Sequence, residues 1–374
     1  MTLVGLDLDA GRARAVSGPA GLTPKPLAVG DGERDLPLAL SLEGRRPGVG
    51  RAGLALLRRS PHLACVDFLP YLGQDRLWEA GRHQIDPAKA MALVFERLRP
   101  IFEGIHGLAL TLPNYLTRAQ ATKLTDLAKK SKLPALGSVI SSLALARIAH
   151  AQQPWFGLAL IIDVDEFALS WTAVVVDEPP APRQMRALVL QAVPALGLRA
   201  WRDVLLDGIA DRCVRQTRRD PRESAVAEQA LYDQLDGALD VCRRGKMVEL
   251  TVQSAQWFQN LILPPAELAL HCRALVAVAV SGLRPLLSTA QSDGPPEVLL
   301  ASAAVARLPG LLPELQRQLG EHTRTVVLPG DATAQAVHQL AELWKAKKLA
   351  AGHIEAALPL ARAAKSDAPV RRAW

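Results

Sequence analysis

The sequence has few aromatic residues and no closely spaced cysteines or histidines. Aromatic residues make up 4% of the chain, and the four cysteines lie far apart, at positions 65, 213, 242 and 272. Without a C-x-x-C pair, the cysteines indicate neither a zinc site nor a disulfide framework. The eight histidines show no H-x-x-x-H spacing. Metal sites built on cysteine or histidine are therefore not predicted.

The sequence also lacks a long hydrophobic run and a secretory leader pattern. The apolar stretches 158–164 and 274–280 are shorter than the roughly 20 residues that a membrane-spanning helix needs. The first seven residues carry no basic residue and reach a carboxylate at Asp7, unlike a signal peptide. We therefore expect a cytoplasmic protein that does not associate with a membrane.

The net charge of +7 comes from basic residues that are dispersed along the chain. Pairs of arginines occur at 45–46, 58–59, 218–219, 243–244 and 371–372. A nucleic-acid interface needs basic residues clustered on one face, usually with aromatic residues that stack on bases. We interpret these arginines as solvated surface residues and expect no nucleic-acid partner.

Strand-like and helix-like apolar patterns alternate along the chain. We expect strands at 3–8, 14–16, 107–112, 158–163, 169–176, 186–193, 247–252, 297–300 and 325–328. We expect helices at 86–101, 117–130, 138–150, 199–217, 226–242, 265–287, 311–319 and 332–348, with Thr117 as an N-cap. Each half of the chain brings strands first and helices after them. This order predicts an α/β protein made of two similar lobes.

The Pro-rich stretch 178–182 is typical of a boundary between such lobes. Lobe I is predicted at 1–180, with an insert subdomain at about 30–105. Lobe II is predicted at 181–331, with an insert at about 218–265. The helix 332–348 is expected to return to lobe I, and 349–374 is expected to form a linker-like tail.

Seven segments resemble, in the same order, the nucleotide-binding domain of the DnaK-type seventy-kilodalton heat-shock chaperones. The most specific, Leu112–Gln120 (L-P-N-Y-L-T-R-A-Q), is similar to the family's V-P-A-Y-F-N-D-A-Q. Others resemble I-G-I-D-L at 4–8, N-P-x-x-T…K-R-L-I-G at 60–73, I-N-E-P-T-A-A-A-L at 140–148, V-F-D-L at 161–164, V-G-G-S-T-R-I-P at 300–309 and P-D-E-A-V-A at 330–336. The resemblance covers roughly residues 3–345. It implies an actin-like ATPase fold, in which two lobes are each built on a mixed sheet flanked by helices.

The resemblance also implies where ATP would bind, and there the sequence departs from the family. Two hairpin tips of Gly and Thr approach the phosphates, because only small residues let backbone N–H groups reach phosphate oxygens. The family's D-L-G-T-T corresponds to residues 7–11, and its D-L-G-G-G-T to residues 163–168. Asp9, Asp165 and Glu166 bring carboxylates to the tips. Phe167 is expected to fill the space of a phosphate.

Other positions of the implied site also carry residues that differ from those with which the family contacts ATP. The family's phosphate-contacting lysine falls on Leu69, and its glutamate falls on Ser141 or Ser142, so no catalytic residue is predicted. The adenine-contacting glycines fall on Ala303 and Ala304, and the ribose-clasping E-x-A-K segment falls on 236–239. The residues that could still contact a nucleotide are Asp7, Gly11, Asp163, Arg307 and Asp331.

Asp7 and Asp163 correspond to family aspartates that orient Mg²⁺-bound water, so they are the candidate metal ligands. The same aspartates also suit a structural role as turn or cap residues. A second possibility is a new cation site that combines them with Asp9, Asp165 and Glu166. The alternative for these three residues is that they are loop-tip residues that face water.

Residues that would contact the phosphates, the ribose and the adenine have changed in each case. This favours a pseudo-ATPase that acts as a protein-interaction scaffold without a cofactor. One alternative is a divergent chaperone-like ATPase that binds Mg-ATP or Mg-ADP. Another is a sugar- or acid-kinase relative, but the catalytic aspartate and the Gly-rich loop of lobe II that such a kinase needs are not found. Fewer than thirty residues follow residue 348, too few for the family's peptide-binding domain. The run 354–360 resembles the family's hydrophobic linker. It is expected either to dock as an added strand on lobe II or to fray. The sequence identifies no specific protein partner and no oligomeric state.

Overall fold

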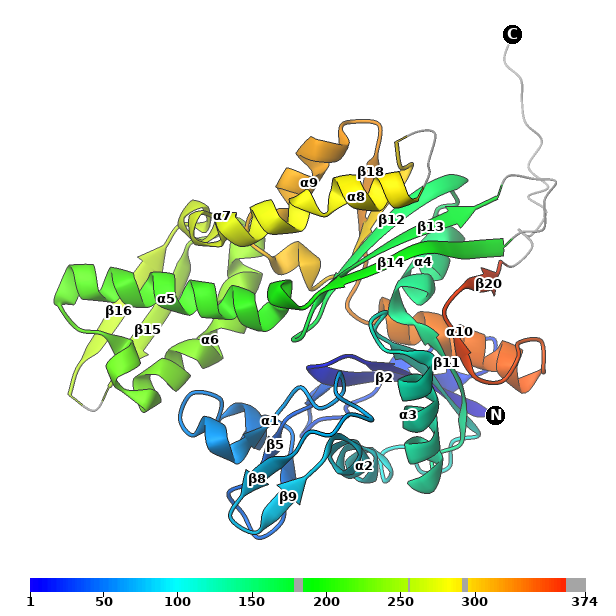
Figure 1. Ribbon diagram of the computed structural model, residues 1–374, viewed down its shortest axis with the longest axis horizontal. Helices are drawn as coiled ribbons and strands as arrows, with labels where there is room; N and C mark the ends of the chain where they lie inside the picture. The colour runs from blue at the N-terminus through cyan, green and yellow to red at the C-terminus, as the bar shows by residue number, and fades with distance from the viewer. Residues whose placement is uncertain (178–183, 255, 291–294, 361–374) are drawn as a thin grey trace.

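Helices make up 40% and strands 27% of the computed structural model, which describes residues 1–177, 184–254, 256–290 and 295–360 (Figure 1). The α/β class predicted from the sequence is therefore confirmed. The Pro-rich stretch 178–182 and the end of the predicted tail, 361–374, lie outside the described residues.

The first sheet is built on one hairpin and two further parallel strands. β1 (Thr2–Leu8) pairs antiparallel with β2 (Arg12–Pro19) and parallel with β10 (Gly107–Leu112), and β10 pairs parallel with β11 (Ala135–Ile140). Within the described residues the sheet has seven strands, in the order β19-β11-β10-β1-β2-β3, with β4 also paired to β2. The short edge strands are β3 (Lys25–Pro26), β4 (Asp35–Pro37) and β19 (His353–Ile354).

The second sheet repeats this plan, with a hairpin next to parallel strands. Its order is β18-β17-β12-β13-β14-β20. The strands are β12 (Gly157–Val164), β13 (Leu169–Val176), β14 (Gln184–Val193), β17 (Val298–Ala301), β18 (Arg324–Val327) and β20 (Ala357–Pro359). β12 pairs antiparallel with β13 and parallel with β17. The predicted lobe boundary at residue 180 falls between β13 and β14, which are neighbours in this one sheet.

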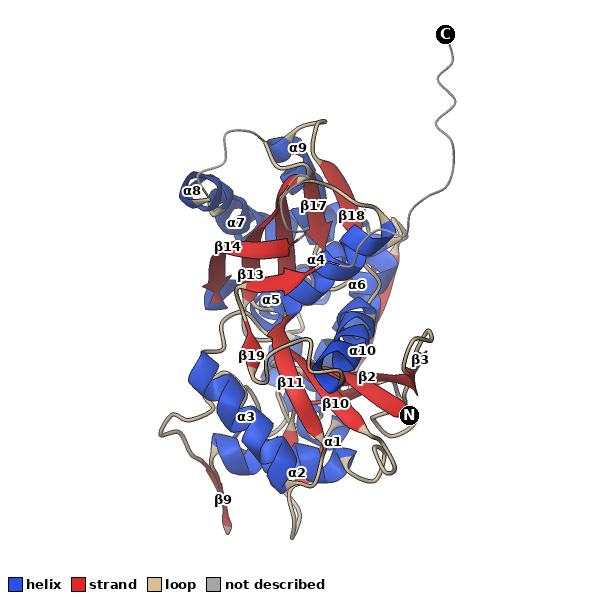
Figure 2. Ribbon diagram, turned by 90° about the vertical axis from the view of Figure 1, so that its right-hand side faces the viewer, coloured by secondary structure: helices blue, strands red, loops and turns tan. Residues whose placement is uncertain are grey.

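Two helices, α4 (Ser141–Gln152) and α10 (Ala332–Lys345), lie between the two sheets (Figure 2). They share one apolar core with side chains from both sheets. Gly5 on β1 permits the close approach of α10, since a Cβ there would lie 2.1 Å from the carbonyl oxygen of Ala334. The two sheets and the two helices therefore form one continuous packed unit.

Further helices cover the outer face of each sheet. The first sheet packs on α2 (Pro87–Leu98) and α3 (Arg118–Lys130), and the second on α5 (Leu198–Thr217), α7 (Pro265–Ser281), α8 (Leu283–Thr289) and α9 (Leu311–Leu319). The N-cap predicted at Thr117 is confirmed. Its hydroxyl accepts the N–H of Gln120 at 3.3 Å, and the Gln120 side chain accepts the N–H of Thr117 at 2.9 Å.

Smaller elements extend from both sheets toward the same side of the molecule (Figure 1). From the first half come β5 (Leu40–Ser41), β6 (Gly48–Val49), α1 (Arg51–Leu54), η1 (Pro61–Leu63), β7 (Ala64–Cys65), β8 (Trp78–Ala80) and β9 (His83–Ile85). From the second half come η3 (Pro221–Glu223), α6 (Ala225–Arg243), β15 (Val248–Gln253) and β16 (Phe258–Leu263). The turns η2 (Pro194–Leu196) and η4 (Val305–Arg307) precede α5 and α9.

The structure corrects two expectations about elements. The helix predicted at 138–150 is wrong at its start, because 135–140 form β11 and α4 begins at Ser141. No Gly or Pro separates the strand from the helix there, and the two serines at the boundary do not cap the helix, since its N-cap residue is Ile140 and makes no side-chain cap hydrogen bond. β16 was not predicted. The helix expected at 265–287 is observed as α7 and α8, joined at Gly282.

The apolar run 274–280 is part of the helical segment Pro265–Thr289, close to the helix expected at 265–287. Pro265–Thr289 has a mean hydropathy of 1.5 in its most apolar window, of which 28% is buried. By length and composition the segment can span a membrane. This is weak evidence, because core helices of globular proteins meet the same criterion.

Candidate functional site

Two hairpins, one from each sheet, meet tip to tip. The first tip (residues 9–11) joins β1 to β2, and the second tip (residues 165–168) joins β12 to β13. The N–H of Asp9 donates to the carbonyl of Arg12 at 3.0 Å, and the N–H of Asp165 donates to the carbonyl of Ala168 at 3.1 Å. Aspartate favours such turns because its carboxylate accepts backbone N–H groups two or three residues further on. The two tips are thus built alike.

The carboxylate of Asp165 accepts hydrogen bonds from both tips. Its Oδ1 accepts the N–H groups of Phe167 and Ala168, each at 2.9 Å. Its Oδ2 accepts the N–H of Ala10 across the gap at 3.0 Å, and also the hydroxyl of Tyr115. Asp165 is only 7% exposed. An anionic side chain of the protein itself therefore lies where N–H groups of two opposed hairpins converge.

Asp9 satisfies the remaining donors of the first tip. Its Oδ1 accepts the N–H groups of Gly11 at 2.7 Å and Arg12 at 2.8 Å. Its Oδ2 accepts the Nε of Arg12 at 3.0 Å, and Arg12 also pairs with Asp35 at 3.2 Å. With Ala10 bonded to Asp165, the N–H groups of residues 10–12 all donate to carboxylates of the chain.

The two tip carboxylates hold protons more tightly than ordinary aspartates. Burial raises the pKa of Asp9 to about 7, with the charges of Asp165 and Asp7 adding to the rise against the pull of Arg12. Burial also raises the pKa of Asp165 to about 6, against the hydrogen bonds that it accepts. Burial raises the pKa of Asp163 as well. Desolvation is the main cause of all three shifts, and neighbouring carboxylates add to those of Asp9 and Asp163.

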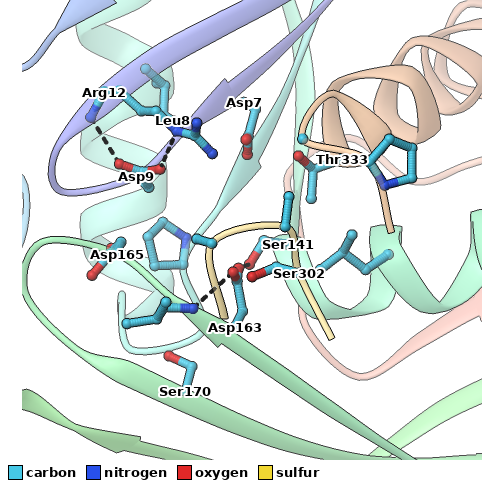
Figure 3. A pocket seen from close by; sticks show the side chains of 17 residues that line it. Asp7, Leu8, Asp9, Arg12, Ser141, Asp163, Asp165, Ser170, Ser302 and Thr333 are labelled. Atoms are coloured by element: carbon cyan, nitrogen blue, oxygen red, sulfur yellow. Dashed lines mark hydrogen bonds and ion pairs between the residues drawn. The ribbon is translucent and has the colours of Figure 1, made fainter. Parts of the chain in front are cut away.

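A cavity of about 30 Å³ lies between the tips and the start of α10, and Figure 3 shows side chains around it. Asp7 and Asp163 approach it from the ends of β1 and β12. Thr111 donates to Asp7 at 2.6 Å, and Ser141 lies 3.5 Å from Asp163. This volume has room for roughly two water molecules and none for a triphosphate.

Two side chains of the second tip do not lie where the sequence analysis placed them. Phe167 does not enter the cavity; its ring packs against Tyr115 and Tyr71, with centroids 5.2 and 6.1 Å apart. Glu166 turns toward Arg202, whose Nη1 lies 2.6 and 2.7 Å from its two carboxylate oxygens. The expectation that Phe167 fills phosphate space is therefore wrong, because an aromatic pocket on the first-sheet side holds the ring instead.

Glycines let the two tips approach closely. A Cβ on Gly11 would lie 2.2 Å from the Cγ of Glu166, and one on Gly197 would lie 2.4 Å from the carbonyl carbon of Phe167. The N–H of Leu198, in the first turn of α5, donates to the carbonyl of Asp165 at 2.7 Å. Gly11 thus serves the contact between the tips, and Gly197 the seating of α5.

Ion pairs connect η4 to α6 and, through Arg202, to the second tip. Arg307 lies 2.9 Å from Asp236 and 2.9 Å from Asp240, and it also donates to the backbone carbonyl of Asp236 at 2.7 Å. Arg202 lies 3.0 Å from Asp236. Partial desolvation would raise the pKa of Asp236, but the nearby charges of Arg202 and Arg307 lower it, and its side chain remains 57% exposed. The predicted contact residue Arg307 is thus committed to carboxylates of α6.

A larger cleft of about 860 Å³ opens beyond the tips, between α1 on one side and α5 and α6 on the other. The arginines that line it are 12, 34, 51, 199, 202 and 307. Five of them, all but Arg34, form ion pairs with carboxylates of the described residues. An anionic ligand in this cleft would compete with these carboxylates for five of the six arginines.

The remaining predicted positions divide into those at the cavity and those away from it. Ser141 lines the cavity, whereas Ser142 does not, and the Ser142 hydroxyl has no hydrogen-bond partner among the described residues. Leu69 is fully buried in the core of the first sheet. Asp331 lies outside the cavity, at the N-terminus of α10, and accepts the side chain of Gln335 at 2.8 Å.

No group of three or more His, Cys, Asp or Glu side chains in the described part of the chain is arranged to hold a metal ion. The reason is visible in the contacts of the acidic residues. Asp9 and Asp165 face backbone N–H groups, and Glu166 faces Arg202. The five carboxylates considered as a cation site therefore do not point at one centre.

The sequence did not predict that the carboxylates of Asp9 and Asp165 accept backbone N–H groups of the tips. It also did not predict that Arg12 pairs with Asp9 or that Tyr115 donates to Asp165. The D-x-G-R and D-x-F-A patterns at the tips are a signal for Asp-capped turns. No spacing signals the Tyr115 contact, which joins residues 50 positions apart. Scans against protein-family models and curated proteins found no match to this chain.

Proposed function

We propose that the chain is a heat-shock-chaperone-like nucleotide-binding-domain homologue with an actin-like ATPase fold that no longer binds ATP. It acts in the cytoplasm as a scaffold for protein partners. The fold part is supported by two sheets of similar plan with α4 and α10 between them, together with the segments that resemble the family. The family resemblance and the actin-like fold are both part of the proposal.

The observation that carries the functional part is the hydrogen bonding of the two tips. In the resembling family, N–H groups at these tips would bind phosphate oxygens. Here Asp9 and Asp165 accept the N–H groups of Ala10, Gly11, Phe167 and Ala168. A phosphate would have to displace a bonded carboxylate and bear its repulsion, and neither is favourable in a desolvated site.

The adenine end of the implied site supports the same proposal. Arg307 spans from η4 to two carboxylates of α6, so the space between these elements is bridged by ion pairs. Leu69 replaces a phosphate-contacting lysine with a buried aliphatic side chain. Phosphate and adenine contacts have thus both been replaced by contacts within the chain.

One surface suits the scaffold role. The outward face of α7 exposes Leu270 and Val278 at 57% and 52%, with the exposed residues Arg273, Ala274 and Ala277 between them. Apolar side chains gathered on one exposed helix face are typical of surfaces that partners cover. This surface supports a binding role without identifying the partner.

The alternative is a divergent ATPase that binds Mg-ATP or Mg-ADP. It is favoured by the cleft of about 860 Å³, a volume typical of small-molecule sites, and by Asp7 and Asp163 at the edge of the cavity. It would require the tip carboxylates to move away when nucleotide enters.

Thermal denaturation with millimolar Mg-ATP, Mg-ADP or Mg²⁺ alone separates the two proposals. The scaffold proposal predicts melting curves that coincide with the curve for Mg²⁺ alone. A nucleotide that binds only the native state would add about 2.7 kcal/mol at a hundred times its dissociation constant. A nucleotide-specific rise in melting temperature would therefore establish the divergent ATPase instead.

A further inference from the structure

Helix α7 has more apolar side chains than the core of the protein covers. Of its 17 residues, only Glu267, His271, Arg273 and Ser281 carry polar side chains, and only four residues of the helix are buried. A helix that is apolar on all sides is typically buried on all sides, in a protein core or in lipid. We therefore expect the rest of α7 to be covered by something other than the core described above.

The exposed apolar residues of α7 follow one line along the helix. They are Ala266, Leu270, Ala274, Ala277 and Val278, and their spacing of three or four residues places them on one helix face. We call the exposed face of residues 266–289, which continues onto α8, the ridge.

The ridge lies on the outside of the molecule. In Figure 2, α7 and α8 lie at the upper left, on the side of the second sheet away from α10. Gly282, which joins the two helices, has a helical φ of −70° and ψ of −18°. The backbone therefore runs from α7 into α8 without leaving the helical region, and the ridge presents one elongated face to the outside.

The exposed charges of the ridge have one sign. Arg273 and Arg284 are exposed, and Glu267 supplies the one carboxylate of the segment 265–289. Glu267 is half-buried and pairs with Arg212 of α5. An occupant of the ridge must therefore match an apolar line flanked by two unpaired positive charges of this segment.

Carboxylates on the helices beside α7 are themselves paired. Glu314 of α9 pairs with Arg317, and Asp211 of α5 lies 2.8 Å from Arg222. They therefore compensate little of the positive charge of the ridge.

Charge separates the possible occupants. A second copy paired about a two-fold axis near Ala274, midway between Leu270 and Val278, would bring the Arg273 side chains of the two copies together. The chain's own residues 361–374 carry four basic residues and one acidic residue. Repulsion between like charges disfavours both occupants, so an anionic partner fits the ridge better.

The apolarity of the segment favours a lipid surface over a protein partner. The most apolar window of Pro265–Thr289 has a mean hydropathy of 1.5, and 28% of it is buried. A transient protein interface is only about as apolar as an ordinary protein surface. A lipid surface offers an apolar layer beneath its headgroups, which suits an exposed line of this apolarity.

We propose that the ridge docks on a lipid surface that carries anionic headgroups. Leu270 and Val278 enter the boundary between headgroups and acyl chains. The stems of Arg273 and Arg284 lie along the helix, and their guanidinium groups reach the headgroups.

This proposal departs from the expectation that the chain does not associate with a membrane. That expectation was drawn from the lack of long apolar runs and of a leader pattern, and docking by one exposed helix face requires neither. The proposal assigns an occupant to the surface that supports a binding role. Nucleotide binding is decided at the tips, so either proposal can fail alone.

Co-sedimentation of the full chain with vesicles tests the docking. We expect binding to vesicles of phosphatidylserine and phosphatidylcholine in equal parts, weaker binding to phosphatidylcholine alone, and loss of binding as salt is added. A chain that does not bind the mixed vesicles would overturn the proposal, and a protein partner would then be the better candidate for the occupant.

A pair of matched variants tests whether the ridge is the contact. Leu270→Glu should weaken binding to the mixed vesicles roughly tenfold or more, because it removes an inserted side chain and adds a repelled charge. Leu22→Glu makes the same change where the side chain is 63% exposed, in the turn after β2, and should bind like the parent. Equal losses would overturn the proposal, since net charge alone would then drive binding. If Leu270→Glu does not fold, Leu270→Gln takes its place.

A second pair separates the ridge arginines from the overall positive charge. Arg273→Gln should weaken binding about fivefold, the effect of one basic residue near an anionic surface. Arg243→Gln, at an exposed position at the end of α6, should leave binding unchanged. Equal effects of the two substitutions would contradict docking through the ridge.

A fluorescent label reports insertion directly. A polarity-sensitive dye on Val278→Cys should shift to shorter emission wavelengths with the mixed vesicles, whereas the same dye on Leu22→Cys should not. The four native cysteines are buried and do not compete for the dye. Binding to the mixed vesicles without a shift at Val278→Cys would overturn the proposal, because the ridge would then remain in water.

Discussion

At the scale of single residues, two aspartates decide the chemistry of the cleft. The sequence correctly predicts carboxylates at both tips, but charge repulsion is only part of their effect. Asp9 and Asp165 also consume the backbone donors that an oxyanion would use. The sequence could be compared with the resembling family only by residue type. The direction in which each aspartate side chain turns could not be predicted, because it depends on partners far away in the chain.

We expect Asp165→Ala to destabilise the protein by about 1–3 kcal/mol, because buried donors lose their acceptor and water replaces it only in part. The free energy of unfolding from urea titrations measures the change. Asp126→Ala, at an exposed position on α3, is the control and should leave stability within about 0.5 kcal/mol of the parent. Equal effects of the two substitutions would show that the Asp165 contacts do not form.

The raised pKa values of Asp9 and Asp165 predict how stability depends on pH. In the unfolded chain these carboxyls titrate near 3.8, whereas in the native state the values are about 7 and about 6. The native state therefore binds protons more tightly, so this contribution is complete below about pH 4 and is lost as the pH rises through 6 to 7.

Asp9→Asn removes one of these titrations while keeping an oxygen that accepts the N–H groups of Gly11 and Arg12. Melting temperatures between pH 5 and 8 should fall less steeply with rising pH in Asp9→Asn than in the parent. Asp126→Asn should keep the parent slope. If Asp9→Asn and Asp126→Asn gave the same slope, Asp9 would have an ordinary pKa.

At the scale of elements, the second hairpin is held to the first-sheet side by an aromatic contact. Phe167 packs between Tyr71, in the segment after β7, and Tyr115, in the segment after β10. Tyr115 also donates its hydroxyl to Asp165, so one residue holds both the ring and the carboxylate of the tip. The position of the second tip thus depends on residues of the first half of the chain.

We expect Phe167→Ala to cost about 1–2 kcal/mol of stability, less than a fully buried phenylalanine, since the ring is half-buried. The loss should be accompanied by faster hydrogen exchange at Ala168. Phe258→Ala, on the outer face of β16 where the ring is 72% exposed, is the matched control. A Phe167→Ala variant as stable as Phe258→Ala would contradict the aromatic contact.

Elements with clear apolar periodicity and caps could be predicted, and those without a local boundary could not. Thr117 marks the start of α3 by residue type and capping geometry. β11 could not be separated from α4, because no Gly or Pro marks the boundary and an apolar run as short as Val139–Ile140 does not by itself distinguish a strand from a helix. Strand β19 has two residues, and no periodicity can be recognised at that length.

At the scale of the whole molecule, the order of strands and helices predicted the α/β class, and the pairing of strands supplied what the order could not. β12 and β13 precede the predicted boundary but belong to the second sheet, next to β14. The sheet to which a strand belongs is decided by long-range pairing and shared cores, which local sequence does not encode. The docking expected for 354–360 is a contact of the same long-range kind: β20 pairs antiparallel with β14 of the second sheet, as expected, and β19 pairs parallel with β11 of the first, which was not anticipated.

The central claim is that carboxylates of the chain already occupy the backbone donors of both tips. Amide hydrogen exchange of Ala10, Phe167 and Ala168, measured with and without millimolar Mg-ATP, tests this claim most directly. We predict protection of all three amides without nucleotide, because each donates to Asp165, and the same protection when Mg-ATP is added. Fast exchange without nucleotide, or protection that appears only with Mg-ATP, would contradict the account.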